Sequence, residues 1–143
     1  MGLAAVLALG LAALAGQAVE SPSVDLRNRV VALTGSSPRE CGLFQLRKAF
    51  EGATRNELEA AVRCARQAVR DGQPFWTANQ RQGIDSWVAH GLLRTSDGAL
   101  HFFVYDSAPC GGPNCRGELS LEPCREVAVK PAADGEPVDF TCR

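Results

Sequence analysis

The centre of the predicted fold is the stretch of residues 87–105, which reads WVAHGLLRTSDGALHFFVY. Aromatic and β-branched residues flank Asp97-Gly98, a dipeptide that favours the tight turns joining antiparallel strands. The stretch therefore predicts a β-hairpin. If Asp97-Gly98 is a two-residue loop, Leu93 lies opposite Phe102, and we expect both side chains to face the core.

Further strands are predicted on both sides of this hairpin. Residues 75–82 have strand composition, and Gln82-Gly83 is predicted as a second two-residue turn. That turn places both tryptophans, Trp76 and Trp87, on the face that carries Leu93. We expect this apolar face to receive the helices. Shorter strands are predicted around residues 118–121, 127–129 and 138–142.

Helical patterns occupy the first half of the chain. Apolar residues at helical spacing predict a helix that begins near Pro22 and ends at Gly35. A capping box predicts a second helix over residues 38–51, and another capping box predicts a third over residues 55–71. The very short loop between the last two predicts antiparallel neighbours.

The order of these elements predicts an α+β fold. We expect two or three N-terminal helices packed on one face of an antiparallel β-sheet, stapled by disulfides. A chain of 143 residues is the size of one domain, and residues 19–143 are expected to form it. This order is similar to that of small exported inhibitor and ligand-binding domains, including the cystatin-like shape. The likeness concerns shape and carries little functional weight.

The start of the chain has the pattern of an export signal. Residues 3–15 contain only Leu, Ala, Val and Gly, a run shorter than the ~20 residues of a membrane span. Small-residue cleavage sites end at Ala15 and Ala18, so residues 1–18 are predicted to be a signal peptide. An uncleaved signal anchor is the alternative, because no Lys or Arg precedes the run. The excess of Arg over Lys indicates a bacterial source. We expect a secreted or periplasmic protein that leaves the membrane after cleavage.

The six cysteines of an exported chain predict disulfide bonds. Two positions lie opposite each other across the predicted antiparallel helix pair, and a second pair brackets a Gly-Gly-Pro-Asn turn. The remaining two are left to join C-terminal strands. The predicted pairs are Cys41 with Cys64, Cys110 with Cys115, and Cys124 with Cys142.

Zinc binding and redox chemistry are the alternatives for the cysteines. A structural zinc site needs four closely spaced ligands, such as two Cys-x-x-Cys knuckles. Thiol oxidoreductases place Cys-x-x-Cys at the start of a helix. Cys110 and Cys115 are instead separated by four residues on a Gly-Pro loop, so we favour a structural disulfide and expect no metal or cofactor.

No sharp catalytic motif is present. The chain lacks a Gly-x-Ser-x-Gly elbow and a phosphate-binding loop. Its net charge of −1 argues against nucleic-acid binding, which needs a basic surface. Acidic side chains beside the predicted strands leave one enzymatic alternative open, a hydrolase that uses carboxylates such as Asp85 and Asp106.

The face of the predicted sheet away from the helices combines an apolar centre with polar edges. Such a surface is typical of a binding site, although C-terminal strands or the first helix covering it would make it a second core layer. The leading interpretation is a non-catalytic exported binding module, either inhibitor-like or holding a small apolar ligand. Its partner would be an unknown protein or that ligand. The candidate binding residues are Phe75, Val88, His90, Leu92, Phe103 and Tyr105.

Overall fold

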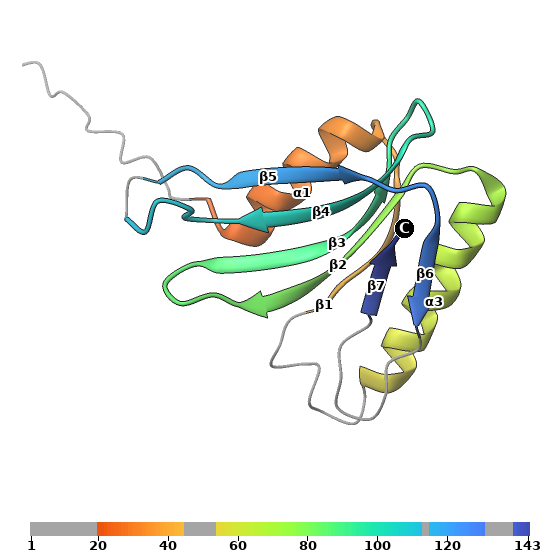
Figure 1. The fold of residues 1–143 in the computed structure, drawn as a ribbon, viewed down its shortest axis with the longest axis horizontal. Helices are drawn as coiled ribbons and strands as arrows, with labels where there is room; N and C mark the ends of the chain where they lie inside the picture. The colour runs from red at the N-terminus through yellow and green to blue at the C-terminus, as the bar shows by residue number, and fades with distance from the viewer. Residues whose placement is uncertain (1–19, 45–53, 113–114, 131–138) are drawn as a thin grey trace, which may run out of the picture.

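The computed structural model describes residues 20–44, 54–112, 115–130 and 139–143. Its main sheet has five strands in the order β1-β2-β3-β4-β5, and β6 and β7 form a separate two-stranded ribbon. Figure 1 shows the helices of the described part of the chain, α1 and α3, on different sides of the curved sheet. The elements are α1 (Pro22–Thr34), β1 (Arg39–Phe44), α3 (Thr54–Asp71), β2 (Phe75–Gln82), β3 (Trp87–Arg94), β4 (Leu100–Asp106), β5 (Glu118–Pro123), β6 (Val127–Lys130) and β7 (Asp139–Cys142).

The structure corrects the predicted fold class. The sheet is mixed rather than antiparallel, because β1 runs parallel to β2. The helices also do not share one face of the sheet. Leu26 and Val30 of α1 pack with Trp76, whereas Leu58 of α3 packs with Phe75. Neighbouring residues of a strand point to opposite faces, so α1 and α3 cover opposite sides of β2.

The stretch predicted to begin a helix at residue 38 is an edge strand where the structure describes it. The capping box from Ser37 to Glu40 is a local signal, and pairing of β1 with β2 overrides it. Gly42 has a φ of +130°, and β1 carries a bulge between Glu40 and Leu43. A Cβ on Gly42 would lie 2.5 Å from the Phe44 ring, so any other residue would be strained by this φ and would displace the ring. Residues 45–51 of the predicted helix lie outside the described ranges.

The predictions for the first and third helices are confirmed. α1 ends at Gly35, whose φ of +93° suits glycine. α3 ends in a Schellman motif, in which the Gly72 N–H donates to the Val69 carbonyl at 3.3 Å. The Gln73 N–H donates to the Ala68 carbonyl at 3.0 Å. Because α3 lies between β1 and β2, it is the crossover that parallel strands require.

The hairpin of β3 and β4 is confirmed, but its loop is one residue longer than expected. The Thr95 N–H donates to the Ala99 carbonyl at 2.9 Å, which leaves residues 96–98 as a three-residue loop. Gly98 takes a φ of +90° at the third loop position, as three-residue hairpins require.

The longer loop changes which side chains share a face. Phe102 lies opposite Leu92, and His101 takes the place opposite Leu93 that was expected for Phe102. Phe103 lies opposite Gly91 and packs in the same buried cluster as Leu93. The turn between β2 and β3 is also longer than predicted, with four residues in place of two. The β2–β3 register moves by an even number of positions, so Trp76 and Trp87 still belong to one apolar cluster.

All three predicted disulfide pairings are present, although the structural basis of the first was wrong. Cys41 lies on strand β1 rather than on a helix, so its disulfide ties a strand to α3. The Cα–Cα distances are 5.5 Å for Cys41–Cys64, 5.8 Å for Cys110–Cys115 and 5.3 Å for Cys124–Cys142.

The export prediction concerns residues 1–18, which lie outside the described ranges. Within those ranges, neither helix is long and apolar enough to cross a membrane.

Candidate functional site

A cavity of about 650 Å³ opens at one end of the sheet, beside the start of α1, the end of β4 and the connection from β4 to β5. Small-ligand pockets typically occupy ~300–1,000 Å³. The lining carries both signs of charge, so it suits a polar group better than a purely apolar one. It consists of Glu20, Pro22, Asp25, Arg29, Asp85, Tyr105, Ser107, Ala108, Gly111, Gly112, Cys115, Arg116 and Gly117.

A chain of hydrogen bonds joins three of these residues. The Tyr105 hydroxyl donates to Asp25 Oδ2 at 2.6 Å. Arg29 Nε lies 3.0 and 2.9 Å from the two carboxylate oxygens of Asp25. Asp25 and Arg29 are one helical turn apart on α1, a spacing that brings side chains together. Hydrogen bonds to charged groups are stronger than neutral ones, so this chain ties α1 to β4 at the edge of the cavity.

Tyr105 keeps its proton in this setting. Burial raises the pKa of the Tyr105 phenol above its ordinary value of 10.0, and the hydrogen bond and negative charge of Asp25 act in the same direction. The Trp87 ring packs edge-on against Tyr105, with ring centroids 5.8 Å apart. Because Tyr105 is only 1% exposed, it shapes the cavity wall rather than offering an accessible acid or base.

Gly117 packs directly on the bond between Tyr105 and Asp25. A Cβ at this position would lie 2.7 Å from Asp25 Oδ2 and closer still to the tyrosine hydroxyl. Real Cβ atoms do not approach so closely, so any side chain at position 117 would displace the hydrogen bond. The connection from β4 to β5 therefore packs against the Tyr105–Asp25 pair through Gly117.

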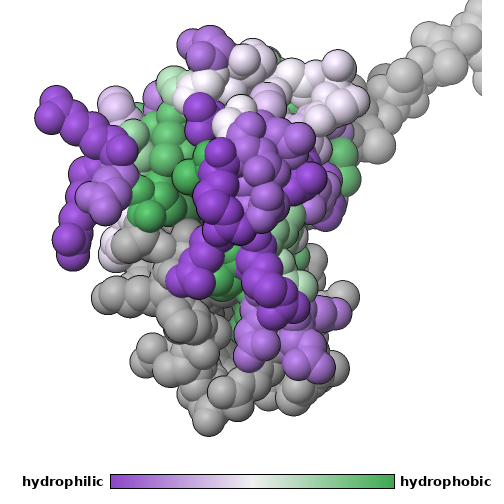
Figure 2. Space-filling model, turned by 90° about the vertical axis from the view of Figure 1, so that its right-hand side faces the viewer, coloured by the Kyte–Doolittle hydropathy of each residue, from purple (hydrophilic) through white to green (hydrophobic). Residues whose placement is uncertain are grey.

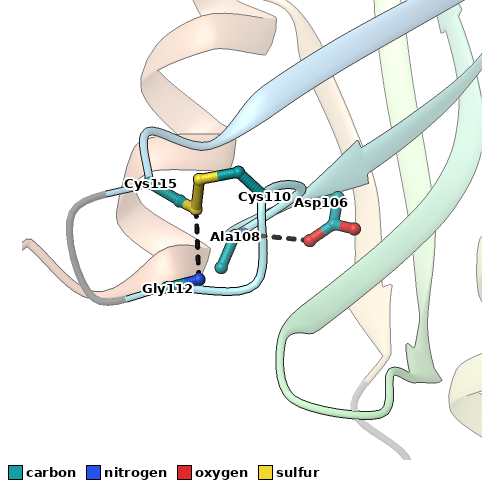
Figure 3. Close-up of a disulfide and its surroundings, with 5 residues drawn as sticks. All are labelled: Asp106, Ala108, Cys110, Gly112 and Cys115. Carbon is teal, nitrogen blue, oxygen red and sulfur yellow. Dashed lines mark hydrogen bonds between the residues drawn. A yellow bond between two sulfur atoms is a disulfide. The ribbon is translucent and has the colours of Figure 1, made fainter.

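The disulfide between Cys110 and Cys115 closes the loop that follows β4, as Figure 3 shows. Cys115 is also one of the residues that line the cavity. The Gly112 N–H donates to Cys115 Sγ at 3.3 Å. At the start of the loop, the Ala108 N–H donates to Asp106 Oδ1 at 2.9 Å. A covalent bond and local hydrogen bonds thus link the described residues at the two ends of this loop.

The loop between β2 and β3 lies next to this disulfide loop. Asp85 of that loop lines the cavity, and its Oδ2 atom would be 3.3 Å from a Cβ placed on Gly111. Ile84, its neighbour, has a relative exposure of 105%, so its apolar side chain projects completely into solvent. Two adjacent loops, one closed by a disulfide and one carrying an exposed isoleucine, therefore border the same cavity.

The predicted binding face does not exist as one open surface. Phe75 and Leu92 lie in the core on the α3 side, whereas Phe103 and Tyr105 lie in the core on the α1 side. All four are at most 1% exposed. The one-residue shift between β3 and β4 turns Phe103 and Tyr105 toward the opposite face, since side chains alternate along a strand.

The last two residues of that predicted face lie on the same side of β3 as Leu92 and do not line the cavity. Val88 is half-buried, and His90 is 7% exposed. Arg81 Nε donates to His90 Nδ1 at 3.0 Å. The His90 ring also lies 5.9 Å from the Phe102 ring. These contacts tie His90 into the sheet.

The two carboxylates of the hydrolase alternative have different surroundings. Asp85 lines the cavity, whereas Asp106 is not among its lining residues. Asp106 instead accepts the Ala108 N–H. No group of three or more His, Cys, Asp or Glu side chains in the described ranges is arranged to hold a metal ion.

Four features of this site were missed by the sequence analysis. Asp25 and Arg29 form an ordinary helical i,i+4 pair, and nothing local shows that Tyr105, 80 positions away, completes it. Ile84 directly follows the predicted Gln82-Gly83 turn, and the Gly-Ile-Asp-Ser sequence around it is a turn signal that says nothing of its exposure. Gly117 carried no signal, because its requirement comes from a contact distant in sequence.

Comparisons of this chain with protein-family models, with curated proteins and with solved structures found no significant match.

Proposed function

We propose that this protein is an exported, non-catalytic binding module that docks on a partner protein through the end of its sheet. The docking edge consists of the Ile84 loop (residues 83–86) and the Cys110–Cys115 loop, with the charged cavity between them and α1. The observation that carries the proposal is the fully exposed Ile84 side chain beside a disulfide-closed loop.

The physical argument concerns the free energy of association. An exposed isoleucine gains from burial in a partner's pocket, because ~25 cal/mol is released per Å² of apolar surface removed from water. A loop already held by a disulfide loses little conformational entropy on binding. The cavity behind the loops presents Arg29, Arg116 and Asp85, which suit polar groups of a protein partner. The same charges make a small apolar ligand the weaker of the two original candidates.

Export is the second part of the proposal. It is supported by the apolar run over residues 3–15, the small residues that follow it, and three disulfides of the kind that persist in oxidising compartments. When the full chain is expressed in a bacterium, the mature protein should be recovered outside the cytoplasm with an N-terminus near Gly16 or Val19. Recovery of membrane-bound protein that begins at Met1 would contradict export.

A hydrolase remains the second candidate, because Asp85 lies at the cavity. Its proposed companion Asp106 accepts a backbone N–H at the start of the disulfide loop, which is a structural role. This contact favours binding over catalysis. Turnover of a glycoside or ester substrate that Asp85→Asn abolishes would reverse the preference.

The docking edge can be tested with two residues that both expose apolar surface. Ile84 and, as a control, Val31 on the other end of α1 (39% exposed) are replaced separately by a photo-crosslinking amino acid. Both proteins are irradiated in the extracellular or periplasmic fraction of the source organism. A defined adduct at position 84 that is absent at position 31 identifies the partner.

The purified partner then allows a direct measurement of affinity. Ile84→Asp should weaken binding by at least about tenfold, as loss of a central apolar contact does, whereas Val31→Asp should leave the Kd unchanged. Equal crosslinking at the two positions, or an Ile84→Asp variant that binds normally, would exclude this edge as the docking site.

A further inference from the structure

A second cavity, of about 730 Å³, lies on the other side of the sheet from the docking edge, along α3 and the start of β1. Four of the residues that line it are arginines, namely Arg39, Arg63, Arg66 and Arg70. No acidic side chain is among its described lining residues. Figure 2, which views the molecule from the α3 side, shows hydrophilic side chains gathered across this surface. We call these four residues the arginine groove.

The helix brings three of these charges together. Arg63, Arg66 and Arg70 are spaced three and four positions apart, so they lie along one face of α3. Like charges at these spacings destabilise a helix by ~0.2–0.5 kcal/mol per pair. A bound anion would relieve that repulsion. The helical spacing therefore brings three positive charges together, and the repulsion between them is relieved when an anion binds.

The fourth arginine comes from a different element and is held in place by a covalent bond. Arg39 is the first residue of β1, and the disulfide from Cys41 to Cys64 ties β1 to the middle of α3. Cys64 itself lines the groove. The backbones that carry the four arginines thus keep their relative positions before any ligand arrives, which lowers the entropic cost of binding.

The described contacts of Arg63 and Arg70 lie on the exposed surface of α3, where Arg70 donates to Gln67 Oε1 at 2.5 Å. Arg63 lies 3.6 Å from Glu59, and the two side chains are 69% and 50% exposed. Exposed pairs of this kind contribute ~0–1 kcal/mol. Gln67, between the arginines, donates to Asp71 at 2.7 Å on the helix surface. A guanidinium has five N–H donors, so such contacts leave donors for a ligand.

We propose that the arginine groove binds a compact polyanion that carries two or more phosphate groups. Arginine is suited to this task because its planar guanidinium donates two parallel hydrogen bonds to a phosphate. The cavity volume exceeds what a single phosphate fills, and the arginines surround it from two elements. The phosphates could belong to a soluble oligophosphate or to clustered lipid headgroups, which share this chemistry.

The test is a calorimetric titration of the full disulfide-bonded protein with inorganic tripolyphosphate. The Arg63→Gln/Arg70→Gln variant should bind at least about tenfold more weakly, and Gln retains good helix propensity. Arg116→Gln is the control, because it removes a charge from the other cavity. Raising the salt concentration should weaken binding of the unaltered protein by screening. Circular dichroism checks that both variants are folded.

A second arm distinguishes the source of the phosphate. The same proteins are sedimented with vesicles of phosphatidylglycerol and phosphatidylcholine, and with phosphatidylcholine alone. Binding to the anionic vesicles that the double variant loses, without binding to tripolyphosphate, supports a lipid headgroup. Tripolyphosphate binding without vesicle binding supports a soluble ligand. The proposal is overturned if neither probe binds, or if Arg116→Gln weakens binding as much as the double variant does.

Discussion

The two faces of the sheet hold their helices by different means. On the α1 side the buried cluster contains the large rings of Trp76, Phe103 and Tyr105. On the α3 side the helix contributes small side chains such as Ala65 and Ala68, and a disulfide joins α3 to β1. None of the disulfides reaches α1. Burial of large apolar rings therefore stabilises the packing of α1. The helix α3 contributes smaller apolar side chains, and a disulfide adds to the stability on that side.

The difference extends to the outer surfaces of the two helices. At α1 the charged pair of Asp25 and Arg29 is joined to the sheet through Tyr105, so polar side chains are part of the packing. At α3 the arginines point away from the apolar cluster and line a separate cavity. Each helix thus borders its own cavity. The Tyr105–Asp25 hydrogen bond joins α1 to the sheet at the first cavity, and the Cys41–Cys64 disulfide joins α3 to β1 at the arginine groove.

The largest expected effect is a loss of stability on the α1 side of the sheet, and it also tests the β3–β4 register. Phe103→Ala should lower the free energy of unfolding by ~3–5 kcal/mol, because Phe103 is completely buried. Phe102→Ala should cost clearly less, since Phe102 is only partly buried at the edge of the α3-side cluster. Chemical denaturation of the two variants makes the comparison. If Phe102→Ala is the more damaging change, the three-residue loop between β3 and β4 is wrong.

The second effect concerns the covalent link on the α3 side. Replacing both Cys41 and Cys64 by serine should cost about 3 kcal/mol, because this disulfide closes a loop of 23 residues. Replacing Cys110 and Cys115 is the control, and its shorter loop of 5 residues predicts a cost of about 2 kcal/mol. Denaturation midpoints measure both. Equal stability of the two double variants would show that α3 is held by packing alone.

The elements that could be predicted from sequence carry their signals locally. α1 and α3 combine helical periodicity with terminal glycines, and β2 to β4 are aromatic-rich and separated by turn residues. The disulfide between Cys110 and Cys115 was predictable because its two ends bracket a turn. Cys41–Cys64 was paired correctly although Cys41 lies on strand β1 and not on a helix, since packing of α3 against β1 also brings these positions together.

The elements that could not be predicted depend on contacts distant in sequence. β1 is short and contains Gly42, so its strand conformation follows from pairing with β2 rather than from composition. Asp-Gly fits both two-residue and three-residue hairpin loops, and the choice reversed the face of Phe103 and Tyr105. The candidate site combines a helix, a strand end and two loops. No single stretch of sequence contains its pattern.

A third prediction isolates the polar link between α1 and the sheet. Tyr105→Phe keeps the buried ring but removes the donor to Asp25, so it should cost on the order of 1.5 kcal/mol. The folded protein holds the pKa of Tyr105 above 10.0. The stabilisation is therefore complete below pH 10 and is lost as the pH rises toward the folded-state pKa. Tyr105→Phe should remove this alkaline component.

Tyr105 is the only tyrosine of the chain, so its titration can be followed directly by phenolate absorbance. The midpoint in the folded protein should lie well above that of the urea-unfolded chain. Gly117→Ala should lower this midpoint, because its Cβ displaces the hydroxyl from Asp25. A phenol that titrates near pH 10 in the folded protein would contradict the Tyr105–Asp25 bond.

The smallest expected effect lies where the β3–β4 loop meets the end of α1. The Ser96 N–H donates to the Leu33 carbonyl at 3.3 Å, so this loop contacts the helix C-terminus. The Thr95 hydroxyl hydrogen bond, followed by that of the Ala99 N–H, holds the pKa of Asp97 below its ordinary value of 3.8. Stabilisation by ionised Asp97 is thus present above pH 3.8 and is lost as the pH falls through the lowered folded-state pKa.

Thermal melts over a pH series measure this effect. Unaltered protein and Asp97→Ala should differ slightly at neutral pH and converge in acid, because protonation of Asp97 removes the same interactions as the substitution. Thr95→Val is the matched control, since it removes the largest cause of the shift and should return the pKa of Asp97 toward 3.8. The carboxyl resonance of Asp97 reports that pKa directly. If it titrates at or above 3.8 in the unaltered protein, the side chain does not hold the three-residue loop, and the contact with α1 rests on the backbone alone.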